Sequence, residues 1–292
     1  MPTYRLNRAA ARYMLGDYRG AISDCEAALK LEPNNAKAFK RLSKAHIELG
    51  DFTRATEVLV AAAAAGAAAS TFSEEASMAA QLGAWQAEGE AAYGNGDFAM
   101  ACTFFANILQ KTNAVPTRLW MTRAELALGR CDRALRVTRE VIKADANQPL
   151  PYVLRATALM YSKDLDQASK HLREALRLDP DLQEAQQGMK KVRKLERHMD
   201  AGKQATHSRQ FGRAKEEYTA ALAAASAPQH APLSAALHAE RGHALLLLKE
   251  YDDALKDCAI AIYSQVCCQP PALPPLTLPP HTACMPPPTP LV

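Results

Sequence analysis

The sequence predicts an all-α solenoid, in which helical hairpins stack one behind another. The first sign is a recurring phrase. Gly-Asp-Tyr at 16–18, followed by Ala21, returns 34 residues later as Gly-Asp-Phe at 50–52, followed by Ala55. The second sign is a small residue in the middle of each expected second helix, found at Ala21, Ala55, Ala101, Ala134, Ala168, Ala214 and Ala254. A fixed period of about 20–50 residues is typical of solenoids, since each unit buries its apolar face only against its neighbours.

The spacing of these alanines divides the solenoid into groups of repeats. Successive steps are 34, 46, 33, 34, 46 and 40 residues. Two steps therefore exceed one repeat by twelve residues, which make about three helical turns or roughly 18 Å. We expect an extra or lengthened helix at these two points, covering the end of one group before the next begins. The result is seven repeats in groups of two, three and two.

Each repeat is expected to be one helical hairpin. The first group spans 1–81, with repeats at 2–35 and 36–69 and a linker helix. The second group spans 82–194, with repeats at 82–115, 115–148 and 149–182 and a long linker helix that runs from Gln183 to Gln204. The third group spans 195–263 and holds two repeats, the second incomplete. Glycines such as Gly96 and Gly129 mark the turns inside hairpins, because a tight turn needs a residue with positive φ.

The basic run KKVRKLER lies in the linker after the fifth repeat, at 190–197. We expect it to be a solvated helix face, with binding of acidic partners as the alternative. After residue 263 the amino-acid composition changes, and ten of the 18 prolines follow Gln269. Val266 stands where earlier repeats have Pro33 and Pro180. Residues 264–292 are therefore expected to be a disordered proline-rich tail that offers PxxP ligands. Because this tail interrupts a repeat, we interpret it as the product of a truncated or read-through gene.

Composition excludes several classes of function. The net charge of +4 is too mild and dispersed for a nucleic-acid protein. The most apolar stretch, Leu59 to Ala69, is far short of the ~20 residues that cross a bilayer. Seven cysteines without a CxxC pair favour reduced thiols and a cytoplasmic or nuclear location. Cys25 and Cys258 occupy the same repeat phrase and are expected to pack in the core.

Catalytic and metal-binding patterns are missing from the sequence. It contains no GxGxxG, P-loop, HExxH or GxSxG motif, and its eight histidines are scattered without metal-ligand spacing. We therefore expect a protein that is not an enzyme and that takes no metal or cofactor.

The repeat phrases resemble the tetratricopeptide repeat (TPR) family, and Trp85 and Gly89 stand where the family signature places Trp and Gly. The resemblance implies a right-handed superhelix of hairpins. It also implies a concave groove, lined by the first helix of each repeat, that binds other proteins.

Three residues of the first two repeats form a candidate site. Lys37 and Arg41 lie four residues apart, so they project from one helix face, and Asn7 on the preceding first helix can point into the same groove. Such cations make charge-assisted hydrogen bonds to carboxylates, with the fork geometry that only Arg offers. The phrases NRAA at 7–10 and KAFKR at 37–41 resemble half of the two-carboxylate clamp of chaperone-binding TPR domains. The resemblance implies binding of the acidic C-terminal tails of the seventy- and ninety-kilodalton heat-shock chaperones.

The alternative is that these cations are an ordinary solvated helix face, together with Lys40 and Lys44. A cation in a first helical turn opposes the helix dipole by roughly 0.3–1 kcal/mol, so Lys37 is slightly unfavourable unless an anion binds. The resemblance also implies a second half of the clamp on a preceding repeat, which this chain begins too late to contain. Losing two charged hydrogen bonds of ~1.5–3 kcal/mol each weakens binding by two orders of magnitude or more.

The middle group predicts a different, more apolar groove. Its candidate residues are Trp85, Trp120 and Leu154. In the fifth repeat, Leu150 and Leu154 stand at the positions that Lys37 and Arg41 hold in the second repeat. A general assembly scaffold, or a regulatory or targeting subunit of an enzyme, would use this groove. These two functions are the alternatives to a co-chaperone-like adaptor.

The grouping of the repeats resembles the TPR region of a family of DnaJ-type co-chaperones over residues 4–263. Against that pattern the chain lacks the first repeat, the last repeat and the J domain, and it contains no His-Pro-Asp tripeptide. We therefore expect no J-domain activity from this polypeptide. The resemblance implies an adaptor for chaperone tails or chaperone-held clients, with no nucleic acid or membrane as partner.

Overall fold

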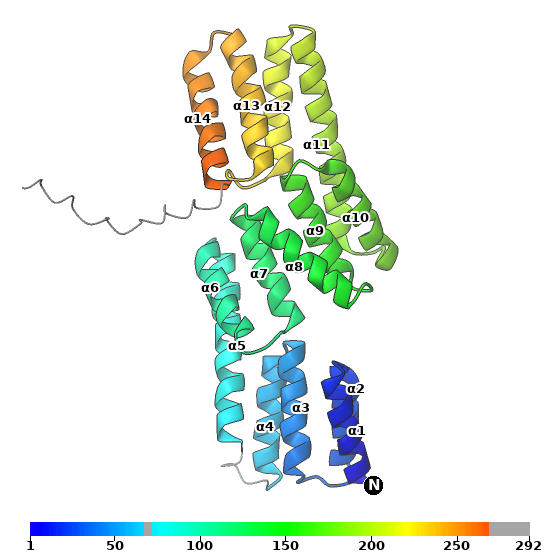
Figure 1. Cartoon of the computed structure of the whole chain (residues 1–292). Helices are drawn as coiled ribbons and strands as arrows, with labels where there is room; N and C mark the ends of the chain where they lie inside the picture. Colours follow the sequence, from blue (N-terminus) through cyan, green and yellow to red (C-terminus); the bar gives the residue numbers. More distant parts are fainter. Residues whose placement is uncertain (67–71, 269–292) are drawn as a thin grey trace, which may run out of the picture.

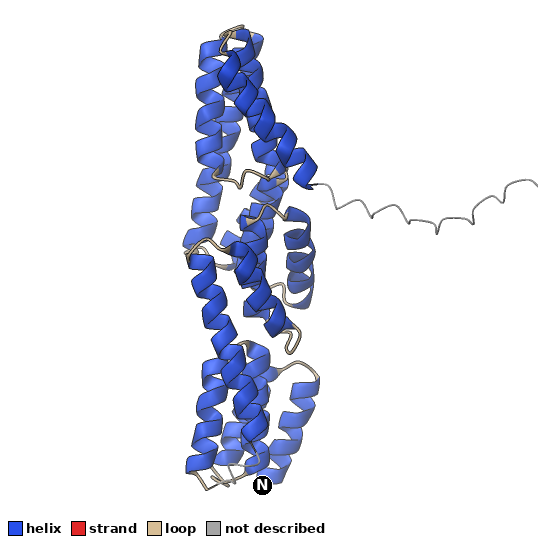
Figure 2. Cartoon of the chain, turned by 90° about the vertical axis from the view of Figure 1, so that its left-hand side faces the viewer, coloured by secondary structure: helices blue, strands red, loops and turns tan. Residues whose placement is uncertain are grey.

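The computed structural model describes residues 1–66 and 72–268, and all regular secondary structure in these residues is helical (Figure 2). Consecutive helices pack against each other as hairpins along an elongated array (Figure 1). The predicted all-α solenoid is therefore confirmed. The first hairpins are α1 (Pro2–Met14) with α2 (Tyr18–Leu29), α3 (Ala36–Leu49) with α4 (Phe52–Ala64), α5 (Ser73–Gly94) with α6 (Phe98–Leu109), and α7 (Val115–Ala127) with α8 (Cys131–Ala144). The others are α9 (Pro149–Tyr161) with α10 (Leu165–Leu178), α11 (Gln183–His207) with α12 (Phe211–Ala225), and α13 (Pro232–Leu247) with α14 (Tyr251–Cys268).

The turn inside each of these hairpins contains one residue in the left-handed conformation. In four turns it is glycine: Gly16, Gly50, Gly96 and Gly129, with φ between +74° and +82°. In the other three it is Lys163, Arg209 or Lys249. An aspartate follows the left-handed residue in four of the seven turns and caps the next helix. Asp17, for example, accepts a hydrogen bond from the backbone N–H of Gly20 at 2.9 Å. The Gly-Asp phrase of the sequence is therefore a turn followed by a helix cap.

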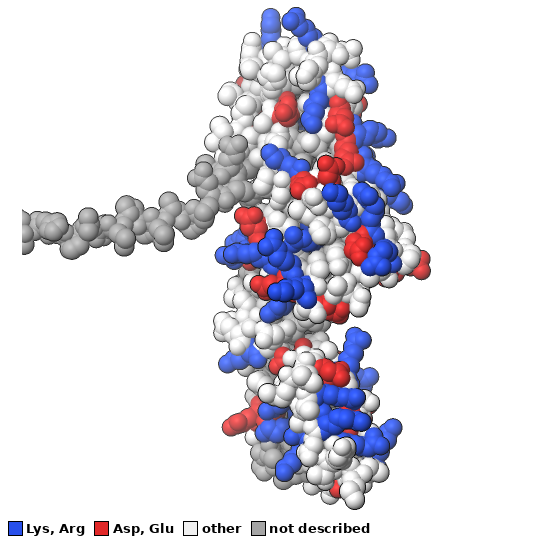
Figure 3. All heavy atoms as spheres, turned by 45° about the vertical axis from the view of Figure 1, so that its right-hand side comes forward, with Lys and Arg blue, Asp and Glu red and all other residues white. Residues whose placement is uncertain are grey.

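The two long steps in the repeat spacing correspond to two long helices. α5 has 22 residues and α11 has 25, whereas α6, which follows α5, has 12. Each long helix is itself the first helix of a hairpin. The extra residues therefore lengthen that helix and do not form a separate one. In α11, Val192 and Leu195 are buried, while Lys190, Arg193 and Lys194 face solvent. Figure 3 shows Lys and Arg mixed with acidic side chains on the face turned toward the viewer.

Small residues allow close packing inside the hairpins. Gly89 in α5 lies against Phe105 in α6, and Gly202 in α11 lies against Tyr218 in α12, each pair 16 residues apart. A Cβ atom at either glycine would lie only 2.7 or 2.8 Å from the aromatic ring. Phe105 and Tyr218 are themselves fully buried. The ring of one helix therefore takes the space that the missing side chain leaves on the other.

The last helix corrects two expectations. α14 continues to Cys268, so the first five residues of the expected tail are helical, because Val266 does not stop the helix as proline does in earlier repeats. The rest of that expected tail, 269–292, lies outside the described residues, as do residues 67–71. Cys25 is buried as expected, but Cys258 is exposed, because no later helix among the described residues packs on it.

Candidate functional site

Arg41 connects the first helices of the first two hairpins. It lies one turn after Lys37 on α3, is half-buried, and donates a hydrogen bond from Nη1 to the backbone carbonyl of Leu6 on α1 at 2.7 Å. Leu6 directly precedes Asn7, which is exposed on α1. The hydrogen bond therefore holds the segment that carries Asn7 beside the guanidinium group, and the two candidate residues belong to one surface.

The cations of α3 fall into two sets. Lys40 is paired with the carboxylate of Glu75 on the lengthened helix α5. That pairing holds the pKa of Glu75 below its usual range. Lys37 is exposed, and no ion pair joins Lys37 or Arg41 to a carboxylate in the described part of the chain. Lys37 and Arg41 therefore present unneutralised charge, whereas Lys40 has a structural partner.

This surface carries cationic hydrogen-bond donors, which are the groups that pair with anions. Arg41 uses one donor on the carbonyl of Leu6 and has further N–H groups to give, while Lys37 offers an ammonium group about one helical turn away. The nearby buried carboxylate of Asp24 does not compete, because Arg8 and Arg12 hold it at 2.8 and 2.9 Å. Burial raises the pKa of the Cys25 thiol to about 11, so this thiol stays protonated at neutral pH.

In the middle of the array, Trp120 of α7 and Leu154 of α9 line one hollow of about 360 Å³, together with Tyr93 and Tyr161. Two charged residues, Arg123 and Glu184, also line it and form an ion pair at 2.8 Å across α7 and α11. The guanidinium carbon of Arg123 lies 5.2 Å from the centre of the Trp120 ring. The hollow therefore has aromatic walls with a charged edge, and it is less apolar than the sequence led us to expect.

Trp85 lies apart from this hollow. It is half-buried in α5 and packs against the apolar cluster that contains Ala79 and Phe105 of its own hairpin. The structure thus brings Trp120 and Leu154 together and leaves Trp85 in a packing role. Arg123 follows Trp120 by three residues, a spacing that makes helix neighbours, so its contribution could have been inferred. Nothing in the sequence links Glu184 to Trp120, because their contact depends on the stacking of separate hairpins.

A larger hollow of about 900 Å³ lies between the first two hairpins and the middle of the array. Part of its apolar lining is formed by Leu49, Pro116, Trp120 and Leu150. Leu150 holds the position in its repeat that Lys37 holds in the second repeat. One edge of this junction is held by Glu48 on α3, whose carboxylate accepts hydrogen bonds from Thr112 Oγ1 at 3.0 Å and from the backbone N–H of Asn113 at 3.4 Å. Residues of first helices and of hairpin turns thus line this hollow.

Residues 1–66 and 72–268 contain neither a metal-binding cluster nor a membrane-spanning helix. No group of three or more His, Cys, Asp or Glu side chains among them could hold a metal ion. Likewise, no helix in these residues has the length and apolar character needed to cross a membrane.

Comparison with known proteins supports the repeat pattern. Three family profiles, each described as "Tetratricopeptide repeat", match residues 13–72, 151–182 and 200–265. Among curated proteins, the chain is similar to DnaJ homolog subfamily C member 7 of Homo sapiens, with 25% identity over 262 residues, which cover 89% of this chain and 52% of that protein. The Schizosaccharomyces pombe homolog is 26% identical, with 89% and 49% covered. The predicted resemblance to a DnaJ-type co-chaperone is confirmed, and the chain spans about half the length of these relatives.

Solved structures match the chain at lower sequence identity. The crystal structure of the P58(IPK) TPR domain is 14% identical, with a TM-score of 0.42, and the match covers 91% of this chain and 89% of that one. The complex of the TPR2AB domain of yeast Sti1 with pHSP90 is 21% identical, with a TM-score of 0.34, and the match covers 66% and 85%.

Proposed function

Because the chain belongs to the tetratricopeptide repeat family, a family of protein-interaction modules, we propose that it is a non-enzymatic adaptor that binds acidic C-terminal peptides. The ligands would be the tails of the seventy- and ninety-kilodalton heat-shock chaperones, in keeping with its similarity to a DnaJ homolog and to the structure of an Sti1 domain with pHSP90. Chaperone-held clients would bind elsewhere on the array. The proposed setting is the cytoplasm, with the nucleus as a second location.

The observation that carries this proposal is the unneutralised pair Lys37 and Arg41 beside Asn7. Arg41 is held in place by the carbonyl of Leu6, so part of its side-chain entropy is already lost before a ligand binds. Asn7 and Lys37 are exposed and open to an incoming peptide. A terminal aspartate has two carboxylates close together, and it offers each of these three side chains a charged or polar acceptor.

The test is a calorimetric titration of the full chain with a peptide ending in Glu-Glu-Val-Asp. The free acid should bind, and the C-terminal amide should bind about tenfold or more weakly, because it lacks one charged acceptor. Lys37→Ala and Asn7→Ala should each weaken binding of the acid. Arg41→Lys should also weaken it, since Lys keeps the charge but loses the fork.

Lys30→Ala is the matched control, because Lys30 is an exposed cation at the end of the neighbouring helix α2. It should leave the affinity unchanged. Equal binding of acid and amide by the unaltered chain would contradict the proposal. So would an equal loss of affinity in Lys30→Ala and Lys37→Ala, since that result would indicate only a general attraction between charges.

A second candidate function, an assembly scaffold, is favoured by the hollow that Trp120 and Leu154 share. The chain has two tryptophans, so Trp85→Phe leaves Trp120 as a single fluorescent reporter inside this groove. A partner that binds there should change the emission of Trp120, and Leu154→Asp should abolish the change. A partner that binds without altering Trp120 emission would place its site outside the middle group.

A further inference from the structure

Two hairpins share an arginine–aspartate pair that joins their two helices. In the first hairpin, Nε of Arg8 on α1 donates a hydrogen bond to Asp24 on α2 at 2.8 Å. In the last hairpin, Nε of Arg241 on α13 donates one to Asp257 on α14 at 2.7 Å. Each arginine lies 13 residues before the recurring alanine of its repeat and 16 residues before its aspartate, and both aspartates are buried. One position in the repeat thus carries a guanidinium group, and another supplies its carboxylate.

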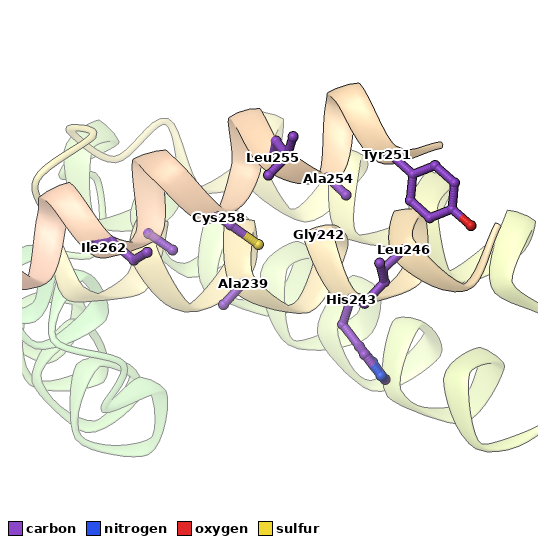
Figure 4. Close-up of a pocket in the computed structure, with 10 residues that line it drawn as sticks. Ala239, Gly242, His243, Leu246, Tyr251, Ala254, Leu255, Cys258 and Ile262 are labelled. Carbon is purple, nitrogen blue, oxygen red and sulfur yellow. The ribbon is translucent and has the colours of Figure 1, made fainter. Parts of the chain in front are cut away.

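The last hairpin shows the surroundings of such a pair. The residues that directly follow Arg241 and Asp257 are Gly242 and Cys258, and both line an apolar hollow of about 650 Å³ between α13 and α14 (Figure 4). A charge beside an apolar region loses part of its hydration, so an opposite charge within hydrogen-bonding distance stabilises it. The aspartate therefore provides the anion that this arginine needs.

The fifth hairpin has the arginine without the aspartate. Arg155 on α9 also lies 13 residues before the recurring alanine, but the residue 16 positions after it is His171 on α10. Nε of Arg155 donates to Nε2 of His171 at 3.2 Å, and Nη1 donates to the backbone carbonyl of Leu135 on α8 at 2.9 Å. The guanidinium group is half-buried, and no carboxylate forms an ion pair with it in the part of the chain that the structure describes. Its charge is therefore not neutralised from within the hairpin.

A second arginine adds to this positive charge. Burial lowers the pKa of the Arg155 guanidinium, and the charge of Arg139 on α8 lowers it further. Arg139 lies one helical turn after Leu135, whose carbonyl holds Arg155, so the two guanidinium groups share one side of α8. Arg139 is exposed and likewise has no acidic partner within residues 1–66 and 72–268. Like charges held together in this way favour the binding of an anion.

His171 adds a neutral donor to the cluster. Burial lowers its pKa, as does the charge of Arg155, while Asp164 and Glu174 act in the opposite direction. Asp164 caps the start of α10 and Glu174 pairs with Arg177 at 2.6 Å, so each of these carboxylates is already engaged. The ring is therefore neutral at neutral pH. Since Nε2 accepts the hydrogen bond from Arg155, the proton lies on Nδ1, which can donate to a ligand.

We propose that Arg139, Arg155 and His171 bind a phosphate monoester, carried by a phosphorylated serine or threonine of a partner protein. Two guanidinium groups match a phosphate dianion in charge, and the fork of arginine matches its oxygens. After its two hydrogen bonds within the chain, Arg155 has three N–H groups left to donate.

The charges favour this ligand over two others. A carboxylate carries a single charge and would leave one of the two arginines unneutralised. A flat anionic membrane would also meet Glu140, which is exposed and directly follows Arg139 in α8, whereas a single phosphate group can approach the arginines alone. The site is also separate from Lys37 and Arg41, which lie on α3.

A calorimetric titration of the full chain with the peptide Ala-Ala-phosphoserine-Ala-Ala, blocked at both ends, tests the proposal. The peptide should bind, and the same peptide with glutamate in place of phosphoserine should bind about tenfold or more weakly, because it carries less charge. Arg139→Gln removes one charge, and Arg155→Lys keeps the charge but loses the fork. Each should weaken binding of the phosphopeptide about tenfold or more.

His171→Asp separates loss of binding from loss of folding. The new carboxylate would lie opposite Arg155, as Asp24 lies opposite Arg8 in the first hairpin. This variant should therefore lose binding of the phosphopeptide, while its thermal unfolding temperature stays the same or rises. A fall in the unfolding temperature together with unchanged binding would contradict the proposed role of Arg155.

Arg136→Gln is the matched control, because Arg136 is another exposed arginine of α8, three residues before Arg139. It should leave the affinity for the phosphopeptide unchanged, and so should Lys37→Ala. No binding of the phosphopeptide, or equal affinity in the unaltered chain and Arg139→Gln, would overturn the proposal. Loss of binding in Lys37→Ala would also overturn it, since the peptide would then lie on the first two hairpins. So would vesicles of phosphatidylserine that bind the unaltered chain but not Arg139→Gln, because the ligand would then be a lipid headgroup.

Discussion

At the scale of single residues, the first and last hairpins contain the same buried ion pair. Asp24 in α2 accepts hydrogen bonds from Arg8, and Asp257 in α14 accepts them from Arg241, with 16 residues between partners in both cases. The hydrogen bond from Arg8 holds the pKa of Asp24 below its usual range, against the effect of burial. Burial also acts to raise the pKa of Asp257, but the hydrogen bonds of Arg241 and His238 leave it lowered.

We predict that Asp24→Asn lowers the free energy of unfolding by about 1–2 kcal/mol near neutral pH, because Arg8 and Arg12 lose a charged acceptor while remaining partly solvated. Because the pKa of Asp24 is lower in the folded state, its carboxylate stabilises the fold at pH values above its unfolded-state pKa of about 3.9. This stabilisation is lost as the pH falls through the folded-state pKa. The difference between the two proteins should therefore vanish in acid. Urea denaturation followed by circular dichroism at neutral and acidic pH measures it, with the exposed Glu26→Gln as control.

The sequence identified some of these residue-level features and missed others. The sequence predicted turns at Gly96 and Gly129, and both have positive φ, as do Gly16 and Gly50 of the repeated phrase. Lys163, Arg209 and Lys249 adopt the same conformation without glycine, because the flanking helices force the turn. Of the predicted groove residues Trp85, Trp120 and Leu154, the last two line one hollow and Trp85 does not. The contact of Glu184 follows only from the stacking of α7 against α11.

At the scale of elements, the close contact between the helices of a hairpin depends on a glycine opposite an aromatic ring. We predict that Gly89→Ala lowers the free energy of unfolding by about 1–3 kcal/mol, because its Cβ would overlap Phe105 and force α5 and α6 apart. Gly94→Ala is the matched control in the same helix, since nothing lies within 4 Å of its Cβ position. Chemical denaturation compares the two, and an equal effect would mean that helix propensity, not packing, decides.

The two lengthened helices correspond to the long steps in the sequence, and we infer that they separate the groups 1–81, 82–194 and 195–263. Repeat spacing predicted their positions because the recurring alanine resumes its place in the repeat after each insertion. The spacing could not show whether the extra residues form a separate helix or lengthen an existing one, since no proline or glycine-rich break lies within them to end a helix. Nor could it predict the ion pair between Lys40 and Glu75, which joins α3 to the start of α5.

At the scale of the whole molecule, a small polar junction lies beside the apolar cluster through which the first two hairpins meet the middle of the array. Glu48 accepts hydrogen bonds from Thr112 and Asn113, and Gly50 lies against Pro116, with a Cβ position 3.2 Å from the proline ring. These contacts fix one edge of the hollow of about 900 Å³ that runs between the groups. The shape of the inner surface therefore depends on these contacts as well as on the apolar cluster that joins Ile47 and Phe52 to Leu82 and Phe105.

We predict that Glu48→Ala opens this junction while the hairpins stay folded. Two hydrogen bonds to a carboxylate contribute about 1.5–3 kcal/mol each, so their loss should raise the population of open arrangements more than tenfold. Small-angle X-ray scattering should then give a larger radius of gyration, with an unchanged helical circular dichroism signal. Glu57→Ala removes a carboxylate whose one ion pair within the described residues is with exposed Arg54, so it should leave the scattering curve unaltered. If Glu48→Ala instead unfolds the first two hairpins, the junction is part of their stability and not a hinge between groups.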